Sequence, residues 1–153
     1  ISLYVRRGFH KICIAKVESD QFVRYSANIG ELCILHGGAS GTLLMAGMTK
    51  KELDAYEKEI GFSKLTENTI TDRITLDKAI KKAKNDGYCA SFKERRNNTA
   101  GIGVPIFDYN NRVVACLNIT LPAERYNPGI IPSWVEILKK AGVEISKKNG
   151  YPT

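Results

Sequence analysis

The chain has 153 residues, of which 43% are hydrophobic and 25% are charged, and its formal net charge is +7. These values are typical of one globular domain that buries its own core. No segment reaches the roughly 18 apolar residues that a membrane-spanning helix needs, so we expect no membrane partner and a cytoplasmic location.

The first predicted elements are two short strands, SLYV at 2–5 and KICIAKVES at 11–19, joined through Gly8 as a hairpin. The glycine-rich stretch HGGASGTLLMAG at 36–47 follows. It lacks the lysine of a P-loop and the glycine order of a dinucleotide fold. What remains is the N-terminus of a helix, whose free N–H groups and dipole favour an anion such as a carboxylate.

Three further helices are predicted. One begins with a capping box at Thr49 and Glu52 and ends at Gly61. The next has Thr75 as its expected N-cap and ends at Gly87. The last helix has Pro132 in its first turn, and its expected apolar face consists of Trp134, Ile137, Leu138, Ala141 and Ile145.

Three strands are predicted at 88–92, 101–107 and 113–121, the last two joined by the tight turn DYNNR. Consecutive strands with short connections favour an antiparallel sheet, and helices are expected to pack against it. The order of the elements therefore predicts a single α+β domain.

The strand at 113–121 has two unlike faces because successive side chains of a strand point to opposite sides. One face is apolar throughout, whereas the other becomes polar at Asn118 and Thr120. In the neighbouring strand, Gly101 and Gly103 leave space beside these two residues. Small residues next to short polar ones indicate a hollow that holds a small polar ligand, although a solvated sheet face gives the same alternation.

Two alternative functions are an enzyme with a thiol nucleophile and direct binding of nucleic acid. The four cysteines form no CxxC pair and have no zinc spacing with the two histidines, so we expect buried thiols, no metal and no cofactor. A thiol-dependent enzyme would use Cys33 or Cys116 as nucleophile and His36 as base. Direct binding of nucleic acid would use the basic surface, but the lysines follow the exposed sides of the predicted helices at 75–87 and 132–148, without interleaved aromatic residues.

Three segments together resemble the C-terminal effector-binding domain of the IclR family of bacterial transcription regulators. They are KVESDQFVRYSANIGELCILHGGASGTLLMAGMTKKEL, TENTITDRITLDKAIKKAKNDGY and GIGVPIFDYNNRVVACLNITLPAER. The resemblance covers nearly the whole chain in the right order. It implies a GAF-like fold with a curved antiparallel sheet, and a regulatory domain in place of an enzyme.

The same resemblance implies a small-molecule effector, often a carboxylate, and assembly as a homodimer or homotetramer. It also implies that DNA is bound only through an N-terminal winged helix-turn-helix domain that is absent from this chain, which has no initial methionine. Phe22, Tyr25 and Cys116 are expected in the pocket wall. The expected effector-binding residues are Ala39, Ser40, Ser91, Thr99, Gly101, Asn118 and Thr120.

Overall fold

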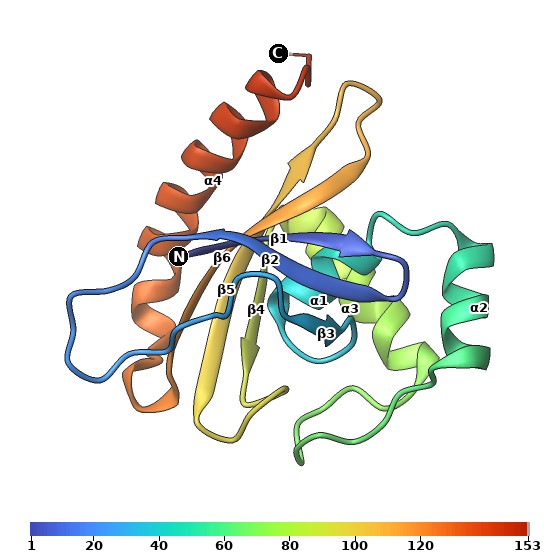
Figure 1. Ribbon diagram of the computed structural model, residues 1–153, viewed down its shortest axis with the longest axis horizontal. Helices are drawn as coiled ribbons and strands as arrows, with labels where there is room; N and C mark the ends of the chain where they lie inside the picture. Colours follow the sequence, from blue (N-terminus) through green and yellow to red (C-terminus); the bar gives the residue numbers. More distant parts are fainter. Residues whose placement is uncertain (153) are drawn as a thin grey trace.

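The computed structural model describes residues 1–152. Within these residues the chain forms six strands, four α-helices and two short 3-10 helices (Figure 1). In chain order the strands and α-helices are β1 (Ser2–Arg7), β2 (His10–Lys16), β3 (Leu32–Ile34), α1 (Ala39–Met45), α2 (Lys50–Glu59), α3 (Arg73–Asp86), β4 (Cys89–Phe92), β5 (Thr99–Phe107), β6 (Val113–Pro122) and α4 (Ile131–Lys148).

The strands form one curled sheet in the order β3-β2-β1-β6-β5-β4. Every neighbouring pair of strands is antiparallel. The N-terminal hairpin joins the C-terminal strands where β1 pairs with β6, and Ser2 lies opposite Asn118. The prediction of a single α+β domain with an antiparallel sheet is therefore confirmed.

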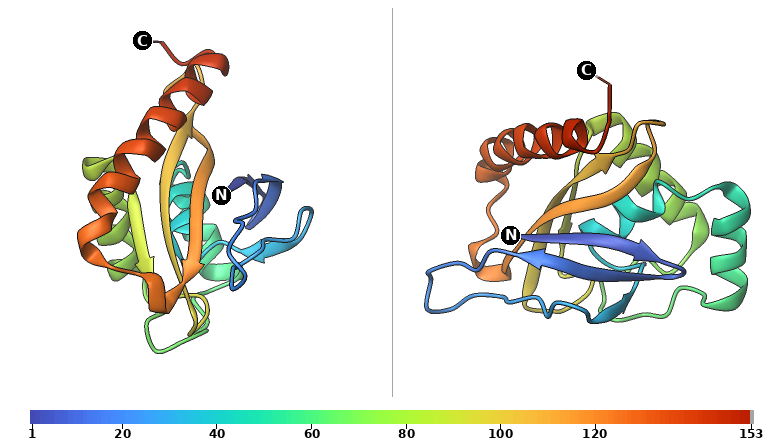
Figure 2. Two further views of the ribbon diagram at one scale, coloured as in Figure 1. Left: turned by 90° about the vertical axis from the view of Figure 1, so that its left-hand side faces the viewer. Right: turned by 45° about the horizontal axis from the view of Figure 1, so that its top comes forward.

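Helices cover both faces of β5 and β6. Helix α4 runs along one face, and α1 lies on the other, inside the curve of the sheet (Figure 2). On the α4 side, Val135 and Leu138 pack against Ile102 and Val104. The larger core on the α1 side includes Leu43 with side chains from α2 and α3. Because both faces of β6 are covered, its polar residues do not lie on a solvated sheet face.

Most of the helix starts and ends predicted from the sequence agree with the structure. Thr49 and Glu52 form the predicted capping box, and Gly87 ends α3 in the left-handed conformation. The expectation of Thr75 as the N-cap of α3 is wrong. Asp72 caps the helix and accepts the backbone N–H of Thr75 at 2.8 Å, because a carboxylate is the stronger acceptor.

Two further expectations are corrected. Ile137 is 64% exposed, because the face of α4 that packs on the sheet consists of Val135, Leu138, Gly142 and Ser146. Strand β3 was not predicted, since three residues are too few for an alternating pattern. No helix within residues 1–152 is both long enough and apolar enough to cross a membrane.

Candidate ligand-binding site

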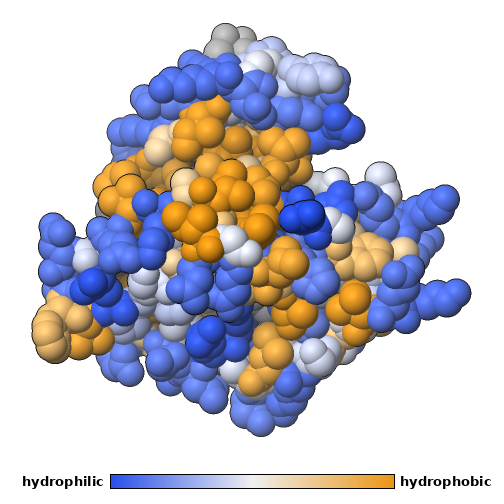
Figure 3. Space-filling model, viewed as in Figure 1, coloured by the Kyte–Doolittle hydropathy of each residue, from blue (hydrophilic) through white to orange (hydrophobic). Residues whose placement is uncertain are grey.

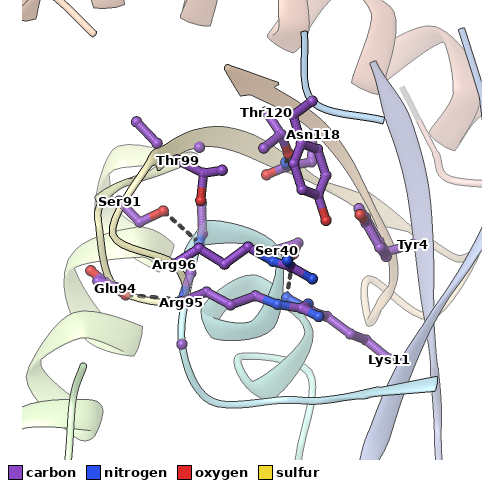
Figure 4. A pocket seen from close by; sticks show the side chains of 16 residues that line it. Tyr4, Lys11, Ser40, Ser91, Glu94, Arg95, Arg96, Thr99, Asn118 and Thr120 are labelled. Carbon is purple, nitrogen blue, oxygen red and sulfur yellow. Dashed lines mark hydrogen bonds between the residues drawn. The ribbon is translucent and has the colours of Figure 1, made fainter. Parts of the chain in front are cut away.

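A small cavity lies between the start of α1 and the polar ends of β5 and β6 (Figure 4). Its volume is about 40 Å³, room for about three water molecules at roughly 10–15 Å³ each. A ligand of this site is therefore small. The lining residues are Tyr4, Lys11, Tyr25, Gly37, Gly38, Ala39, Ser40, Ser91, Glu94, Arg95, Arg96, Thr99, Ala100, Gly101, Asn118 and Thr120.

The structure brings the seven expected effector-binding residues to this one cavity, and Tyr25 of the expected wall lies there too. Two other wall residues do not. Phe22 is 98% exposed on the loop after β2. Cys116 is fully buried in the core cluster next to the cavity and does not line it.

The start of α1 differs from the expectation of free amides. The N–H of Ala39 donates to Ser91 Oγ at 3.0 Å, and the N–H of Gly38 donates to a carboxylate oxygen of Glu94 at 3.0 Å. The helix has only seven residues, so its dipole is short. The expected anion seat on the Ala39 amide is therefore already taken by a side chain of the protein.

Gly101 is needed for this close approach. A Cβ at Gly101 would lie 3.2 Å from Ser91 Oγ and 3.7 Å from Ala39 Cβ. A Cβ at Gly103 would lie 2.9 Å from Cys116 Sγ. The two glycines let α1 sit close against β5, and only Gly101 also borders the cavity.

Lys11 supplies a buried positive charge to the cavity. Its side chain comes from β2 and is only 2% exposed. The ammonium group donates to Ser40 Oγ at 2.8 Å and lies 5.5 Å from the centre of the Tyr4 ring. Burial, with repulsion from Arg95 as the second cause, lowers the pKa of Lys11 from 10.5 to about 8.

The loop after β4 adds three more charged side chains. Arg95 donates to Cys33 Sγ at 2.8 Å, and the guanidinium of Arg96 lies 5.8 Å from the centre of the Tyr25 ring. Burial raises the pKa of Glu94, although its bond with Gly38 acts in the opposite direction. Among residues 1–152, no carboxylate lies within 4 Å of the cationic group of Lys11, Arg95 or Arg96.

The backbone of this loop is held from behind by the TxxT part of the segment that resembled the family. Thr66 Oγ1 donates to the carbonyl of Lys93 at 2.5 Å, and Thr69 Oγ1 donates to the carbonyl of Glu94 at 2.7 Å. Lys93 has a φ of 54°, an unusual conformation for a residue other than glycine. The two hydroxyls thus fix the turn that presents the arginines.

Asn118 closes the opposite side of the cavity. The side chain is 4% exposed, and its amide nitrogen donates to Thr120 Oγ1 at 2.9 Å. Its carbonyl oxygen Oδ1 is buried and has no hydrogen-bond partner within residues 1–152. Buried polar atoms almost always have a partner, so this oxygen indicates a missing donor.

Sequence reasoning missed the charged half of the site, which consists of Lys11, Glu94, Arg95 and Arg96. One signal was available for Lys11: it alternates with Cys13 on the inward face of β2, where a lysine is unusual. The loop residues gave no such signal, because a charge run after a strand is usually solvated.

The thiol alternative is not supported by the geometry. His36 Nδ1 lies 2.7 Å from the Tyr56 hydroxyl and Nε2 lies 2.9 Å from the carbonyl of Ser63. No hydrogen bond joins His36 to Cys33 or Cys116 in the described part of the chain. Burial raises the pKa of Cys116, which disfavours the thiolate that a nucleophile requires.

Comparison with known proteins agrees with the fold. The sequence profile described as "Bacterial transcriptional regulator IclR C-terminal" matches residues 1–147. The HTH-type transcriptional regulator KipR of Bacillus subtilis is 32% identical over 151 residues, which are 99% of this chain and 60% of that protein. The chain therefore belongs to the IclR family, as its C-terminal effector-binding domain, and this is a family of regulators and not of enzymes.

Solved structures give the same result. The crystal structure of the Thermotoga maritima IclR has a TM-score of 0.91 and 33% identity, and the match covers 98% of this chain and 61% of that one. A double mutant of the inducer-binding domain of PobR from Acinetobacter, solved as a 3-hydroxybenzoic acid complex, has a TM-score of 0.84 and 22% identity over 95% of this chain and 86% of that one. The present chain thus spans about 60% of the longer relatives.

Proposed function

We propose that this domain senses a small organic acid, which binds in the cavity between α1 and β6 and changes DNA binding by the rest of the polypeptide. The observation that carries the proposal is the buried ammonium group of Lys11, which faces the cavity without a carboxylate partner. A buried cation is costly unless an anion compensates it, and a carboxylate ligand would do so.

The names of two relatives support this proposal. KipR is a transcriptional regulator of the helix-turn-helix type, and the PobR domain was solved with a carboxylic acid. A DNA-binding region outside this chain would respond to the acid if the two arrangements of the protein differ in their affinity for it. We place this protein in the cytoplasm, where its four free cysteines would stay reduced.

We also propose that the domain assembles with a second copy, as a dimer or tetramer. Figure 3 shows apolar side chains gathered between the C-terminal half of α4 and β1, and a groove there is lined by Leu3, Val5, Val114 and Ile145. Exposed apolar patches of this kind often mark interfaces. Light scattering after size-exclusion chromatography should report an oligomer for the wild type and a monomer for Val114→Asp.

The sensing proposal is tested by isothermal titration of short carboxylic acids against the domain. We expect at least one acid to bind, and Asn118→Ala to weaken the best of them at least tenfold. Asn110→Ala, in the exposed turn between β5 and β6, is the matched control and should bind as the wild type does. The proposal fails if no acid binds, or if Asn118→Ala binds as tightly as the control.

A further inference from the structure

We infer that the effector is a short dicarboxylate that carries a hydroxyl group. The inference rests on the proposed function and deepens it, because it names the class of acid. It comes from the charges around the cavity and from Asn118 Oδ1, the one buried side-chain polar atom without a partner within residues 1–152.

The cavity has an excess of positive charge. Lys11, Arg95 and Arg96 each contribute one positive charge, and Glu94 contributes one negative charge. Glu94 is bound to the N–H of Gly38 and lies beyond 4 Å from each of the three cationic groups, so it forms an ion pair with none of them. The net charge of the lining is therefore +2, which a ligand with two carboxylates neutralises and a monoacid does not.

The cationic groups also have free hydrogen-bonding capacity. The Lys11 ammonium uses one of its three donors on Ser40 Oγ. Arg95 donates to the thiol of Cys33, which is a weak acceptor. In Figure 4 the two arginine side chains extend across the cavity toward Lys11 and Ser40. Carboxylates that accept bonds from these groups would be held by charge-assisted hydrogen bonds, the stronger kind.

The hydroxyl group follows from Asn118. Its Oδ1 is an acceptor that is buried and unpaired, whereas its amide nitrogen already donates to Thr120. A ligand group that contacted this oxygen would have to be a donor, and an ionised carboxylate has none. A hydroxyl group on the carbon chain between the two carboxylates supplies it.

The size of the cavity limits the length of the chain. A volume of about 40 Å³ does not hold an aromatic ring or a long aliphatic acid unless the walls move. Arg96 is exposed at the edge of the cavity, so its side chain can swing outward without unpacking the core. Because about 40 Å³ is room for only about three water molecules, a diacid also needs this movement of Arg96, and a chain of three or four carbons needs the least of it. L-Malate is an acid of this length with the required groups.

The test compares L-malate with three probes that each remove one feature. Succinate lacks the hydroxyl, 3-hydroxybutyrate replaces one carboxylate by a methyl group, and inorganic phosphate is a compact anion with no carbon chain. In isothermal titration at pH 7, we expect malate to bind at least tenfold more tightly than each of the other three.

Two variants assign these preferences to residues. Lys11→Met should weaken malate binding at least tenfold and reduce the preference for malate over 3-hydroxybutyrate to less than threefold. Asn118→Ala should reduce the preference for malate over succinate to less than threefold. Lys51→Met, on the exposed side of α2, is the control and should keep all the ratios of the wild type. Thermal unfolding followed by circular dichroism verifies that each variant is folded.

The outcomes separate this inference from the function on which it rests. If 3-hydroxybutyrate or another short monoacid binds within threefold of malate, the inference of a dicarboxylate is wrong, but the proposal of an acid sensor is unaffected. If succinate binds as tightly as malate, the inference of a hydroxyl group is wrong. If phosphate does so, the inference of a carbon chain is wrong. If no acid binds the folded wild type, the inference and the proposed function both fail.

Discussion

Helix α4 and helix α1 cover opposite faces of the same two strands, but they enclose different chemistry. Under α4, Leu138 and Val135 meet Ile102 and Val104, and the contact is apolar. Under the start of α1, the buried groups include the Lys11 ammonium and the Asn118 carboxamide. Burial of apolar side chains therefore stabilises the fold on the α4 face. On the α1 face it leaves buried polar groups without full hydrogen bonding, which is expected where a ligand binds.

The largest expected effect is on the α4 face. Leu138→Ala removes a fully buried side chain and should lower the free energy of unfolding by about 3 kcal/mol, measured by urea denaturation. Ile137→Ala changes the neighbouring exposed residue and should stay within about 0.5 kcal/mol of the wild type. Similar losses in the two variants would show that α4 does not pack as described.

On the α1 face, a substitution is expected to raise the free energy of unfolding. Lys11→Met removes a buried charge without a carboxylate partner and keeps a side chain of similar length. The lowered pKa of Lys11 corresponds to about 3 kcal/mol at neutral pH, so the variant should be more stable than the wild type by up to that amount. Lys51→Met should show no gain. A destabilised Lys11→Met would mean that Lys11 supports the fold and not a ligand.

The pH dependence of this difference sharpens the comparison. Lys11 keeps a pKa of 10.5 in the unfolded chain and has a pKa of about 8 in the folded domain, where it faces Arg95, Cys33, Cys116 and Glu94. Between these two values the unfolded chain holds more protons, so Lys11 makes wild-type stability rise with pH. The advantage of Lys11→Met should be full below pH 8 and disappear toward pH 10.5.

Urea denaturation of both proteins between pH 6.5 and pH 10 measures this difference, and groups that titrate in both proteins cancel from it. A difference that stays constant over the whole range would show that the pKa of Lys11 is not lowered in the folded state.

The smallest expected effect is that of Asn118→Ala on the free domain. The change removes one hydrogen bond to Thr120 together with a buried oxygen that has no partner, and these two effects offset each other. The free energy of unfolding should change by less than about 1 kcal/mol. Ser146→Ala is the comparison on the α4 face, where the hydroxyl bonds to the N–H of Phe107 and the carbonyl of Gly142. It should cost more than Asn118→Ala.

Much of the fold could be predicted because local patterns determine it. The capping box at Thr49, the glycine stop at Gly87 and the turn before β6 depend on neighbours in the chain, and the structure has all three. The N-cap of α3 was wrong because Asp72 and Thr75 are both good caps, and the sequence does not say which side chain accepts the bond.

The site was predictable only on its uncharged side. The two faces of β6 and the glycines of β5 pointed to Asn118, Thr120 and Gly101, which do line the cavity. Lys11 and the loop arginines come from segments far apart in the chain, and only the tertiary fold brings them together. The expectation that Phe22 lines the wall rests on the family resemblance alone, and the side chain is exposed to solvent.

The threonine pair behind the 93–94 turn affects the entropy of association. Thr66 and Thr69 fix the carbonyls beneath the arginines by bonds that involve only the protein itself, so these bonds exist before any small molecule arrives. A ligand that bound there as proposed would cost this turn little conformational freedom, so more of the electrostatic attraction would remain as affinity. Removal of the two hydroxyls would leave every charge in place and still lower the affinity, because a more mobile turn would have to be ordered each time a ligand binds.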